Sequence, residues 1–150
     1  MSDEVRLADI TAANRAAVIA LELAEDQQDL VSSNAQSLRD AARNRDARPR
    51  AIYADETLVG FLMYDAPDGP DEPDQATIYR FMIDQAFQHK GYGRSALTCA
   101  IDEIRAVPGI RRILILYVPG NEVARQFYAS LGFVELGPDE DDEMVAELRL

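Results

Sequence analysis

The sequence predicts a single α/β domain, residues 1–150, in which a mixed, mostly antiparallel sheet of about seven strands carries helices on both faces. Its 150 residues, 47% of them hydrophobic, suit one compact core. Strand-like and helix-like segments alternate along the chain. One helix-like segment separates two strand-like segments, 76–84 and 113–118, a unit that normally places its two strands in parallel.

The first third of the chain predicts one strand followed by two helices. Residues 5–10 form a weak strand pattern that Thr11 ends as a helix cap, and the Ala- and Leu-rich stretch 12–24 has helical spacing. Ser33-x-x-Gln36 resembles a capping box that opens a second helix. Pro49 is expected to end this pair of helices.

The middle of the chain predicts a hairpin, a further strand and the strand–helix–strand unit. Residues 50–67 are rich in strand formers and are split by Asp55-Glu56, and the second strand is apolar on both faces. Residues 65–75 hold three prolines and five acids and predict a solvated loop. The helix expected over 91–107 then leads to 113–118, a continuous apolar run typical of a strand buried on both faces.

The last third predicts a short helix and a hairpin. Asn121 is a suitable cap, Tyr128 lies on an apolar helical stripe, and Gly132 suits a left-handed stop. Two strands, 133–136 and 144–150, are then expected around an acidic turn.

Charge and cysteine content limit the classes of function. Twenty-seven acidic and fifteen basic residues give a net charge of −12, which disfavours nucleic acids and anionic membranes as partners and favours small cationic molecules. Cys99 is the one cysteine, which fits a reducing cytoplasm. No apolar run reaches the length of a membrane span, and the acidic start lacks the features of a secretory signal.

The segment Gln88-His89-Lys90-Gly91-Tyr92-Gly93-Arg94 joins a predicted strand to a predicted helix. The first N–H groups of a helix and its dipole attract anions, and glycine permits close approach. Lys90, the one lysine of the chain, and Arg94 add positive charge. The segment therefore predicts a phosphate-binding turn, although the glycines could also serve only to shape it.

A dinucleotide-binding turn is the competing interpretation, because Gly91-x-Gly93-x-x-Ala96 also fits that pattern. The dinucleotide pattern places its first glycine at the end of the strand and an acid at the end of the next one. Here six residues separate Asp84 from Gly91, and the next strand ends in Tyr117-Val118-Pro119. The context disfavours this alternative.

A family resemblance rests on two separated motifs. Gln88-x-x-Gly91-x-Gly93, together with Asn121-x-x-Ala124-x-x-x-Tyr128-x-x-x-Gly132-Phe133, resembles the GNAT superfamily of acetyl-CoA-dependent N-acetyltransferases. The segments 79–84 and 9–17 are similar, more narrowly, to bacterial diamine and spermine/spermidine acetyltransferases. The resemblance covers nearly the whole chain and is strongest from Ile52 to Phe133.

The resemblance implies a sheet splayed between its fourth and fifth strands, with the pantetheine arm of acetyl-CoA paired to one strand edge and the pyrophosphate on backbone amides of the turn. It implies these cofactor-binding residues: Phe81, Met82, Ile83, Gln88, His89, Lys90, Gly91, Tyr92, Gly93, Arg94, Ser95, Asn121 and Ala124. It implies that Tyr128 approaches the sulfur as the catalytic residue. A phenol of pKa about 10 is protonated at neutral pH and can protonate a departing thiolate.

The acceptor is expected to be a primary amine, most naturally a diamine or polyamine, which enters opposite coenzyme A. An alkylammonium must lose a proton before it attacks, while carboxylates hold its distal charge. An acidic cluster near the first helices supplies candidate substrate-binding residues: Glu22, Glu25, Asp26 and Asp29. Clusters of acids are, however, usually solvated surfaces.

Several alternatives stay open at this stage. Asn121 is equally suited to capping alone, and Tyr128 to a place in the core. The chain could acetylate a protein N-terminus, an amino acid or a drug amine, or be a non-catalytic acyl-CoA sensor. No His/Cys spacing suggests a metal, and His89 and Cys99 are expected to be structural. A homodimer through an exposed sheet edge is left open.

Overall fold

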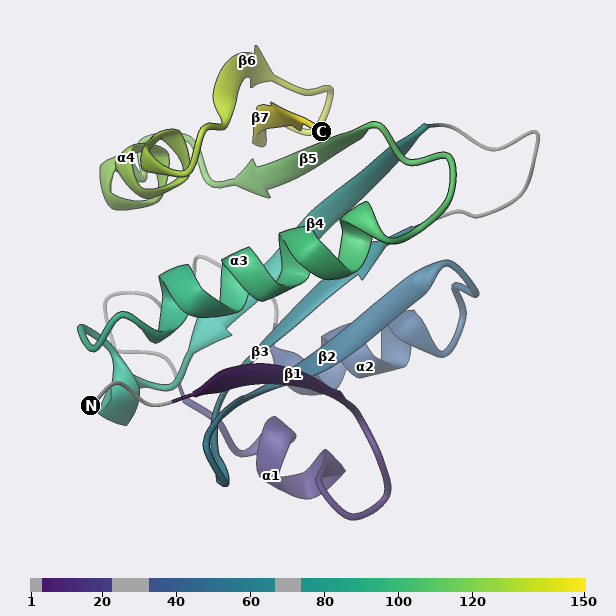
Figure 1. The fold of residues 1–150 in the computed structure, drawn as a ribbon, viewed down its shortest axis with the longest axis vertical. Coiled ribbons are helices and arrows are strands. Elements are labelled where there is room, and N and C mark those ends of the chain that lie inside the picture. The colour runs from purple at the N-terminus through teal and green to yellow at the C-terminus, as the bar shows by residue number, and fades with distance from the viewer. Residues whose placement is uncertain (1–3, 23–32, 67–73) are drawn as a thin grey trace.

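The computed structural model describes residues 4–22, 33–66 and 74–150. Their strands form one seven-stranded sheet in the order β1-β2-β3-β4-β5-β7-β6 (Figure 1). The strands are β1 (Val5–Asp9), β2 (Ala47–Ala54), β3 (Thr57–Asp65), β4 (Gln75–Ile83), β5 (Arg112–Tyr117), β6 (Val134–Pro138) and β7 (Met144–Arg149). The helices are α1 (Arg15–Ile19), α2 (Asn34–Ala41), α3 (Tyr92–Arg105) and α4 (Glu122–Ser130), with a 3₁₀ turn η2 (Gln85–Phe87).

The sheet is mixed, as predicted. β4 and β5 are parallel neighbours, and every other neighbouring pair within the described residues is antiparallel. Helix α3 connects the two parallel strands and lies across the sheet in Figure 1. A connection of this length is what a parallel pair requires.

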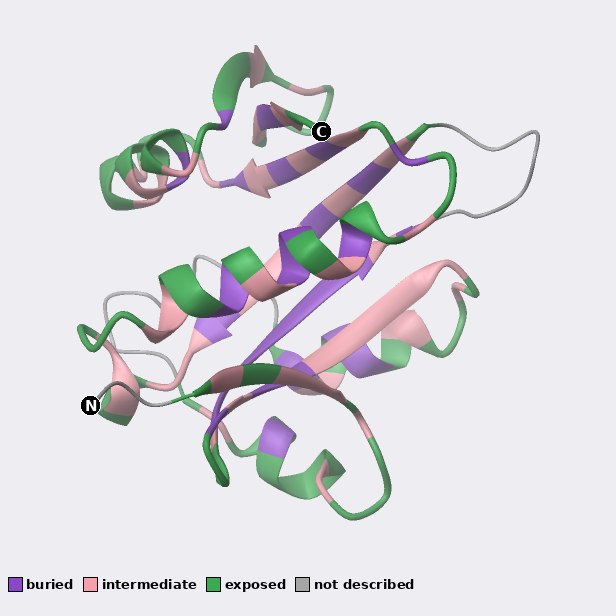
Figure 2. Cartoon of the chain, viewed as in Figure 1, coloured by how far each residue is buried: buried purple, intermediate pink, exposed green. Residues whose placement is uncertain are grey.

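Two hydrophobic clusters cover the two faces of the sheet. The larger one joins α3 and Tyr128 of α4 to the sheet, whereas the smaller one joins Val18 of α1 and Leu38 of α2 to it. β3 lies between the clusters and is buried from Val59 to Tyr64, as its apolar residues predict (Figure 2). Helices therefore cover both faces, which confirms the predicted fold class.

The expectation that 113–118 is buried on both faces is wrong. In β5 the buried residues Ile113, Ile115 and Tyr117 alternate with residues that are half-buried. The smaller cluster contains residues of β2, β3 and β4 and none of β5. Because the smaller cluster does not extend to β5, the second face of this strand is only partly covered.

The first helix is much shorter than the predicted stretch 12–24. It begins after Asn14, not after Thr11, because the Thr11 carbonyl accepts the N–H groups of Asn14 and Arg15 in a turn. The helix ends at Ile19, and residues 23 and 24 lie outside the described residues. By contrast, the Ser33 cap is confirmed, since its hydroxyl accepts the Gln36 N–H at 3.1 Å.

The expectation that Pro49 ends the helical pair also needs correction, because Pro49 lies within β2. Its neighbour on β3 is Met63, but the pairing of β2 with β1 stops at Arg50 and Asp9. A proline tolerates such a position because its missing N–H removes no bond to β1. Most of the acidic, proline-rich stretch 65–75 lies outside the described residues.

Candidate active site

The sheet opens between β4 and β5. Their pairing begins at Gln75 and Arg112 and stops at Ile78 and Ile115, although both strands continue. Figure 1 shows them running apart toward their carboxyl ends. The stretch 79–83 of β4 therefore has no strand neighbour on its β5 side within the described sheet.

An irregularity in β4 coincides with this opening. Met63 pairs with Arg80 while Tyr64 pairs with Ile78, so Tyr79 is an extra residue in the ladder. Such a bulge bends a strand and changes the side to which the following residues point. Accordingly, Ile78, Phe81 and Ile83 all belong to the α3 cluster, although strict alternation would separate Ile78 from Phe81.

A cavity of about 530 Å³ lies in the opening. Its walls come from the end of β4, the turn after it, the start of α3, the end of β5 and helix α4. The structure brings these predicted site residues together on its lining: Phe81, Met82, Ile83, Gln88, His89, Gly91, Tyr92, Gly93, Arg94, Asn121, Ala124 and Tyr128. Lys90 and Ser95 are exposed neighbours of this lining and do not belong to it.

The start of α3 has the geometry of an anion site. Gly91 is its N-cap residue with φ +84°, and no side chain caps the helix. The Ser95 N–H donates to the Gly91 carbonyl at 3.2 Å. A helix start leaves its earlier N–H groups without partners inside the helix, and glycine adopts positive φ without steric cost. The cleft is thus lined by a helix start that attracts negative charge.

The turn before α3 is held by side-chain contacts to the backbone. Gln88 donates its amide N–H to the Ile83 carbonyl at 2.9 Å. The Asp84 carboxylate accepts the Ala86 N–H at 2.9 Å and the Glu22 N–H at 2.8 Å. These bonds fix the turn both to the end of β4 and to the segment that follows α1.

Glu22 lies beside this turn and outside the cavity lining. Its carbonyl accepts the Gln85 N–H at 2.7 Å, and its carboxylate accepts the Gln85 side-chain amide at 3.2 Å. Glu25, Asp26 and Asp29 lie outside the described residues. Of the four predicted acceptor-binding acids, Glu22 is thus the one whose position is described.

Arg94 points toward α4. Its guanidinium donates to the Ser130 hydroxyl at 2.7 Å and lies 5.6 Å from the centre of the Phe127 ring. A Cβ atom on Gly93 would lie 3.6 Å from Phe81 and 3.8 Å from both Ile83 and Phe127. The missing side chain of Gly93 thus leaves the cleft open between β4 and α4.

Tyr128 lies at the inner side of the cleft and is 8% exposed. Its ring packs against Tyr117 at 5.6 Å and Phe133 at 6.1 Å. Its hydroxyl makes no hydrogen bond with any described residue. Burial, and secondarily the neighbouring Tyr117, raises the pKa of Tyr128 above its ordinary value. The phenol therefore stays protonated at neutral pH.

Asn121 caps α4, because its side-chain oxygen accepts the Ala124 N–H at 3.2 Å. Since Asn121 also lines the cavity, capping does not exclude a second role. Sequence reasoning missed five other lining residues: Phe87, Tyr117, Val118, Val123 and Phe127. Phe127 was visible as a neighbour of Tyr128 on the helical stripe, whereas nothing in the sequence distinguished the other four from core or surface residues.

Two kinds of feature are absent from residues 4–22, 33–66 and 74–150. No group of three or more His, Cys, Asp or Glu side chains there could hold a metal ion. No helix in those ranges is long and apolar enough to cross a membrane.

The cleft fits coenzyme A. An uncapped helix start suits the pyrophosphate, the free edge of β4 offers backbone groups to the amides of pantetheine, and Gly93 leaves room between the walls. These features define the class of protein, an acyl-CoA-dependent transferase with a splayed sheet. The chain belongs to the GNAT acetyltransferase family, whose model matches residues 12–133.

Relatives and solved structures agree with this assignment. The chain is 30% identical over 145 residues to a spermine/spermidine N(1)-acetyltransferase of Bacillus subtilis, covering 93% of this chain and 95% of the relative. It is 33% identical over 63 residues to a ribosomal protein bS18 alanine N-acetyltransferase of Haemophilus ducreyi, covering 42% and 43% of the two chains.

The fold is similar to that of solved acetyltransferases. A paia N-acetyltransferase from Thermoplasma acidophilum, in complex with coenzyme A, superposes with a TM-score of 0.72 at 17% identity, covering 98% of this chain and 99% of that one. The aminoglycoside acetyltransferase AAC(6')-Ib, also with coenzyme A, gives 0.79 at 16% identity, with coverage of 97% and 95%. The protein is an N-acetyltransferase that uses acetyl-CoA.

Proposed function

We propose that the protein transfers the acetyl group of acetyl-CoA directly to a primary amine of a diamine or polyamine, with Tyr128 as the general acid. The observation that carries the proposal is the convergence, on one cavity, of the splayed end of β4, the uncapped start of α3 and the Tyr128 phenol. Each part suits one requirement of direct acetyl transfer.

The cofactor-binding part of the proposal uses the turn 88–95 and the free edge 81–83. Backbone N–H groups at the start of α3 hold the pyrophosphate, and exposed Lys90 adds positive charge beside them. The backbone of Phe81 to Ile83 pairs with the amides of pantetheine, because β5 has diverged from it. Asn121 and Ala124 contact the same arm from α4.

Acetyl-CoA supplies a thioester, and the chain supplies a proton donor and hydrogen-bond donors around it. A buried Tyr128 with a raised pKa carries its proton throughout the neutral range and can give it to a departing thiolate. Backbone N–H groups of the stretch 79–83 that face the opening have no β5 neighbour, and they can hold the charge that develops on a carbonyl oxygen. No covalent bond between enzyme and acetyl group is needed.

The choice of acceptor draws on charge and on the relatives. A net charge of −12 attracts polycations and raises their concentration near the protein surface. The relative that covers 93% of this chain is named for spermine and spermidine. Glu22, whose side chain is exposed next to the turn, is the described member of the acidic cluster that we propose to hold the distal ammonium. The lone thiol of Cys99 fits a cytoplasmic setting.

An amine panel tests the acceptor class. Purified protein and acetyl-CoA are incubated separately with putrescine, spermidine, spermine, a peptide with an N-terminal alanine, free amino acids and an aminoglycoside, and the products are identified by mass spectrometry. We expect a kcat/KM for the best diamine or polyamine at least about tenfold above every other acceptor, which corresponds to about 1.4 kcal/mol. A faster peptide, amino acid or aminoglycoside reaction would overturn the polyamine assignment. If none of the amines gains an acetyl group, the result would indicate a non-catalytic acyl-CoA sensor.

A further inference from the structure

We infer that Glu135, on the edge strand β6, is a positioning residue for acetyl transfer, because it fixes the Tyr117 phenol, whose ring in turn fixes Tyr128 in the cleft. The inference deepens the proposed function and rests on the role assigned there to Tyr128. Neither Glu135 nor Tyr117 belongs to the residues implied by the family motifs. Two contacts carry the inference, one from Glu135 to Tyr117 and one from Tyr117 to Tyr128.

The first contact joins β5 to the edge of the sheet. Tyr117 is the last residue of β5, is 8% exposed and lines the cavity. Its hydroxyl donates a hydrogen bond to the Glu135 carboxylate at 2.8 Å. β7 lies between the two strands, and Ala146 of β7 is the register neighbour of Glu135. Tyr117 itself pairs with Met144 of β7, so the hydrogen bond crosses β7 diagonally.

A bulge in β6 lies directly beside Glu135. Glu135 pairs with Ala146 whereas Gly137 pairs with Val145, so the residue between them is extra. Bulges at sheet edges commonly change the direction of a neighbouring side chain. Glu135 is an exposed residue on an edge strand, where a carboxylate is normally only solvated. Here the carboxylate instead accepts a hydrogen bond from the hydroxyl of Tyr117, which lines the cleft.

The second contact joins Tyr117 to Tyr128. Their ring centres are 5.6 Å apart with planes inclined by 52°. The other close ring neighbours of Tyr128 are Phe127 at 5.5 Å and Phe133 at 6.1 Å. Within the described chain, Tyr117 is thus the one aromatic neighbour of Tyr128 that a hydrogen bond holds in place. Ring packing determines the orientation of Tyr128, because its own hydroxyl has no partner among those residues.

The charges around Tyr117 fix the direction of its hydrogen bond. Burial and then the bond to Glu135 raise the pKa of Tyr117 to about 12. On α4, Arg125 opposes this effect and Glu122 adds to it, both more weakly. The phenol therefore remains the donor and the carboxylate the acceptor at neutral and moderately alkaline pH.

A mutant cycle tests the inference. Tyr117→Phe, Glu135→Ala and their combination are made in the natural chain and in a Tyr128→Phe chain, and kcat, KM and the Kd for coenzyme A are measured. In the natural chain we expect each change to lower kcat by about 3- to 10-fold, with Kd changed less than about 2-fold, and the combination to be no worse than either single change. In the Tyr128→Phe chain neither change should lower kcat further.

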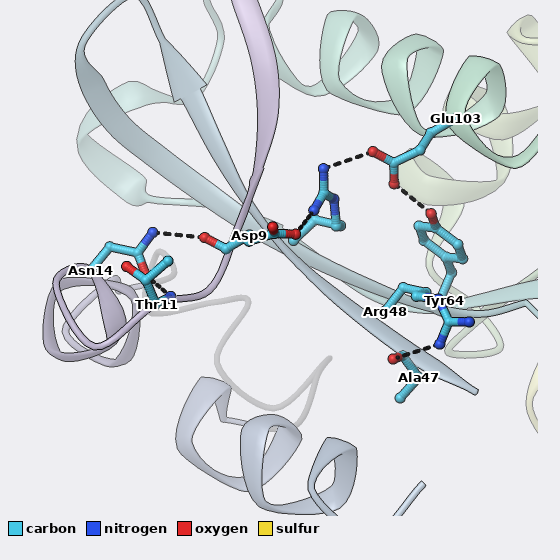
Figure 3. A network of polar contacts seen from close by, with 8 residues as sticks. Asp9, Thr11, Asn14, Ala47, Arg48, Tyr64 and Glu103 are labelled. Atoms are coloured by element: carbon cyan, nitrogen blue, oxygen red, sulfur yellow. Dashed lines mark hydrogen bonds and ion pairs between the residues drawn. The ribbon is translucent and has the colours of Figure 1, made fainter. Parts of the chain in front are cut away.

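Two control variants separate positioning from general stability. Glu135→Gln keeps an acceptor oxygen for the Tyr117 hydroxyl and should retain most of the activity. Tyr64→Phe removes another tyrosine–glutamate hydrogen bond, from Tyr64 to Glu103, which lies outside the cleft (Figure 3). It should leave kcat unchanged, whatever it does to the melting temperature.

The contrary outcomes distinguish the positioning role of Glu135, the general-acid role of Tyr128 and the proposed function. Full activity in Glu135→Ala, or an equal loss of kcat with and without Tyr128, would overturn the positioning role and leave the proposed function intact. Full activity in Tyr128→Phe alone would overturn the general-acid assignment, and the positioning role with it. A failure of all variants, including Tyr64→Phe, to acetylate any amine while still folded would indicate a fault in the proposed function itself.

Discussion

Phe81 on β4 and Phe127 on α4 face each other across the cleft, with ring centres 6.4 Å apart and planes inclined by only 17°. The strand pairing that would otherwise join β4 to β5 has already ended at Ile78. Aromatic side chains therefore join β4 to α4 where backbone hydrogen bonds no longer hold β4 and β5 together. Gly93 lies next to both rings. The dimensions of the cleft depend on side-chain volume at these three positions.

Gly93→Ala should weaken coenzyme A binding without destabilising the protein. The new methyl group would lie 3.6–3.8 Å from Phe81, Ile83 and Phe127, which is ordinary van der Waals contact, so the fold accepts it while the cleft loses space. Alanine in a helix is also favoured over glycine by up to about 1 kcal/mol. Calorimetric titration should show at least about a tenfold higher Kd, or about 1.4 kcal/mol, at an unchanged or higher melting temperature. Unchanged affinity would contradict the assigned position of the cofactor.

Gly60→Ala is the contrasting change and should damage the fold. A Cβ atom at Gly60 would lie 2.4 Å from the backbone oxygen of Met82, so β3 and β4 would have to separate at the opening of the sheet. Overpacking of this kind typically costs about 1–3 kcal/mol. Chemical denaturation should show a loss of stability in that range together with weaker binding of coenzyme A. If the variant keeps both its stability and its affinity for coenzyme A, β4 can shift at this position without damage to the fold or the cleft.

Tyr128→Phe should lower kcat by about 100-fold, the lower end of what a general acid contributes. The change removes a hydroxyl that has no hydrogen-bond partner among the described residues, and it keeps the ring that packs against Tyr117 and Phe133. Affinity for coenzyme A and the melting temperature should therefore change little. If kcat and affinity fall equally, Tyr128 is a binding residue.

Asp84→Ala should destabilise the turn before α3. The Asp84 carboxylate accepts N–H groups from Ala86 and Glu22, and the alanine variant leaves both without this acceptor. Loss of such a cap costs about 0.5–2 kcal/mol. Amide hydrogen exchange at Glu22 and Ala86 should accelerate, and coenzyme A should bind more weakly. Asp84→Asn, which keeps one acceptor oxygen, should show a smaller effect on both measurements.

Stability should fall as the pH rises above 10. Burial is the largest cause that raises the pKa of Tyr64, Tyr79, Tyr117 and Tyr128 above the ordinary value of 10.0. Below pH 10 these phenols are neutral in both states and contribute no pH dependence. Above it they ionise first in the unfolded chain, which is thereby favoured.

Absorbance titration of the tyrosinate band, combined with circular dichroism, checks this dependence. Four of the six tyrosines should ionise only well above pH 10 or together with unfolding. A complete titration near pH 10 in a folded protein would contradict the burial of these side chains.

Much of the fold was predictable because its signals are local. The Ser33 cap, the turn at Asp55-Glu56 and the left-handed Gly132 depend on backbone chemistry within a few residues, and all three were predicted correctly. The early end of α1 was missed because the chain just beyond the helix is held by long-range bonds, from Glu22 to Asp84 and Gln85. Helical propensity carries no information about such partners.

By itself the sequence determined the order of the elements, the glycine-bearing turn at the start of a helix, and Tyr128 on an apolar stripe, because each depends on neighbours along the chain. Only the tertiary structure decided where β4 and β5 separate, since the bulge at Tyr79 appears only when β4 pairs with β3. It also placed Tyr117 and Glu135 within 2.8 Å of each other, 18 residues apart and across a third strand. Contacts of that kind depend on strand order and register, which no local pattern of residues encodes.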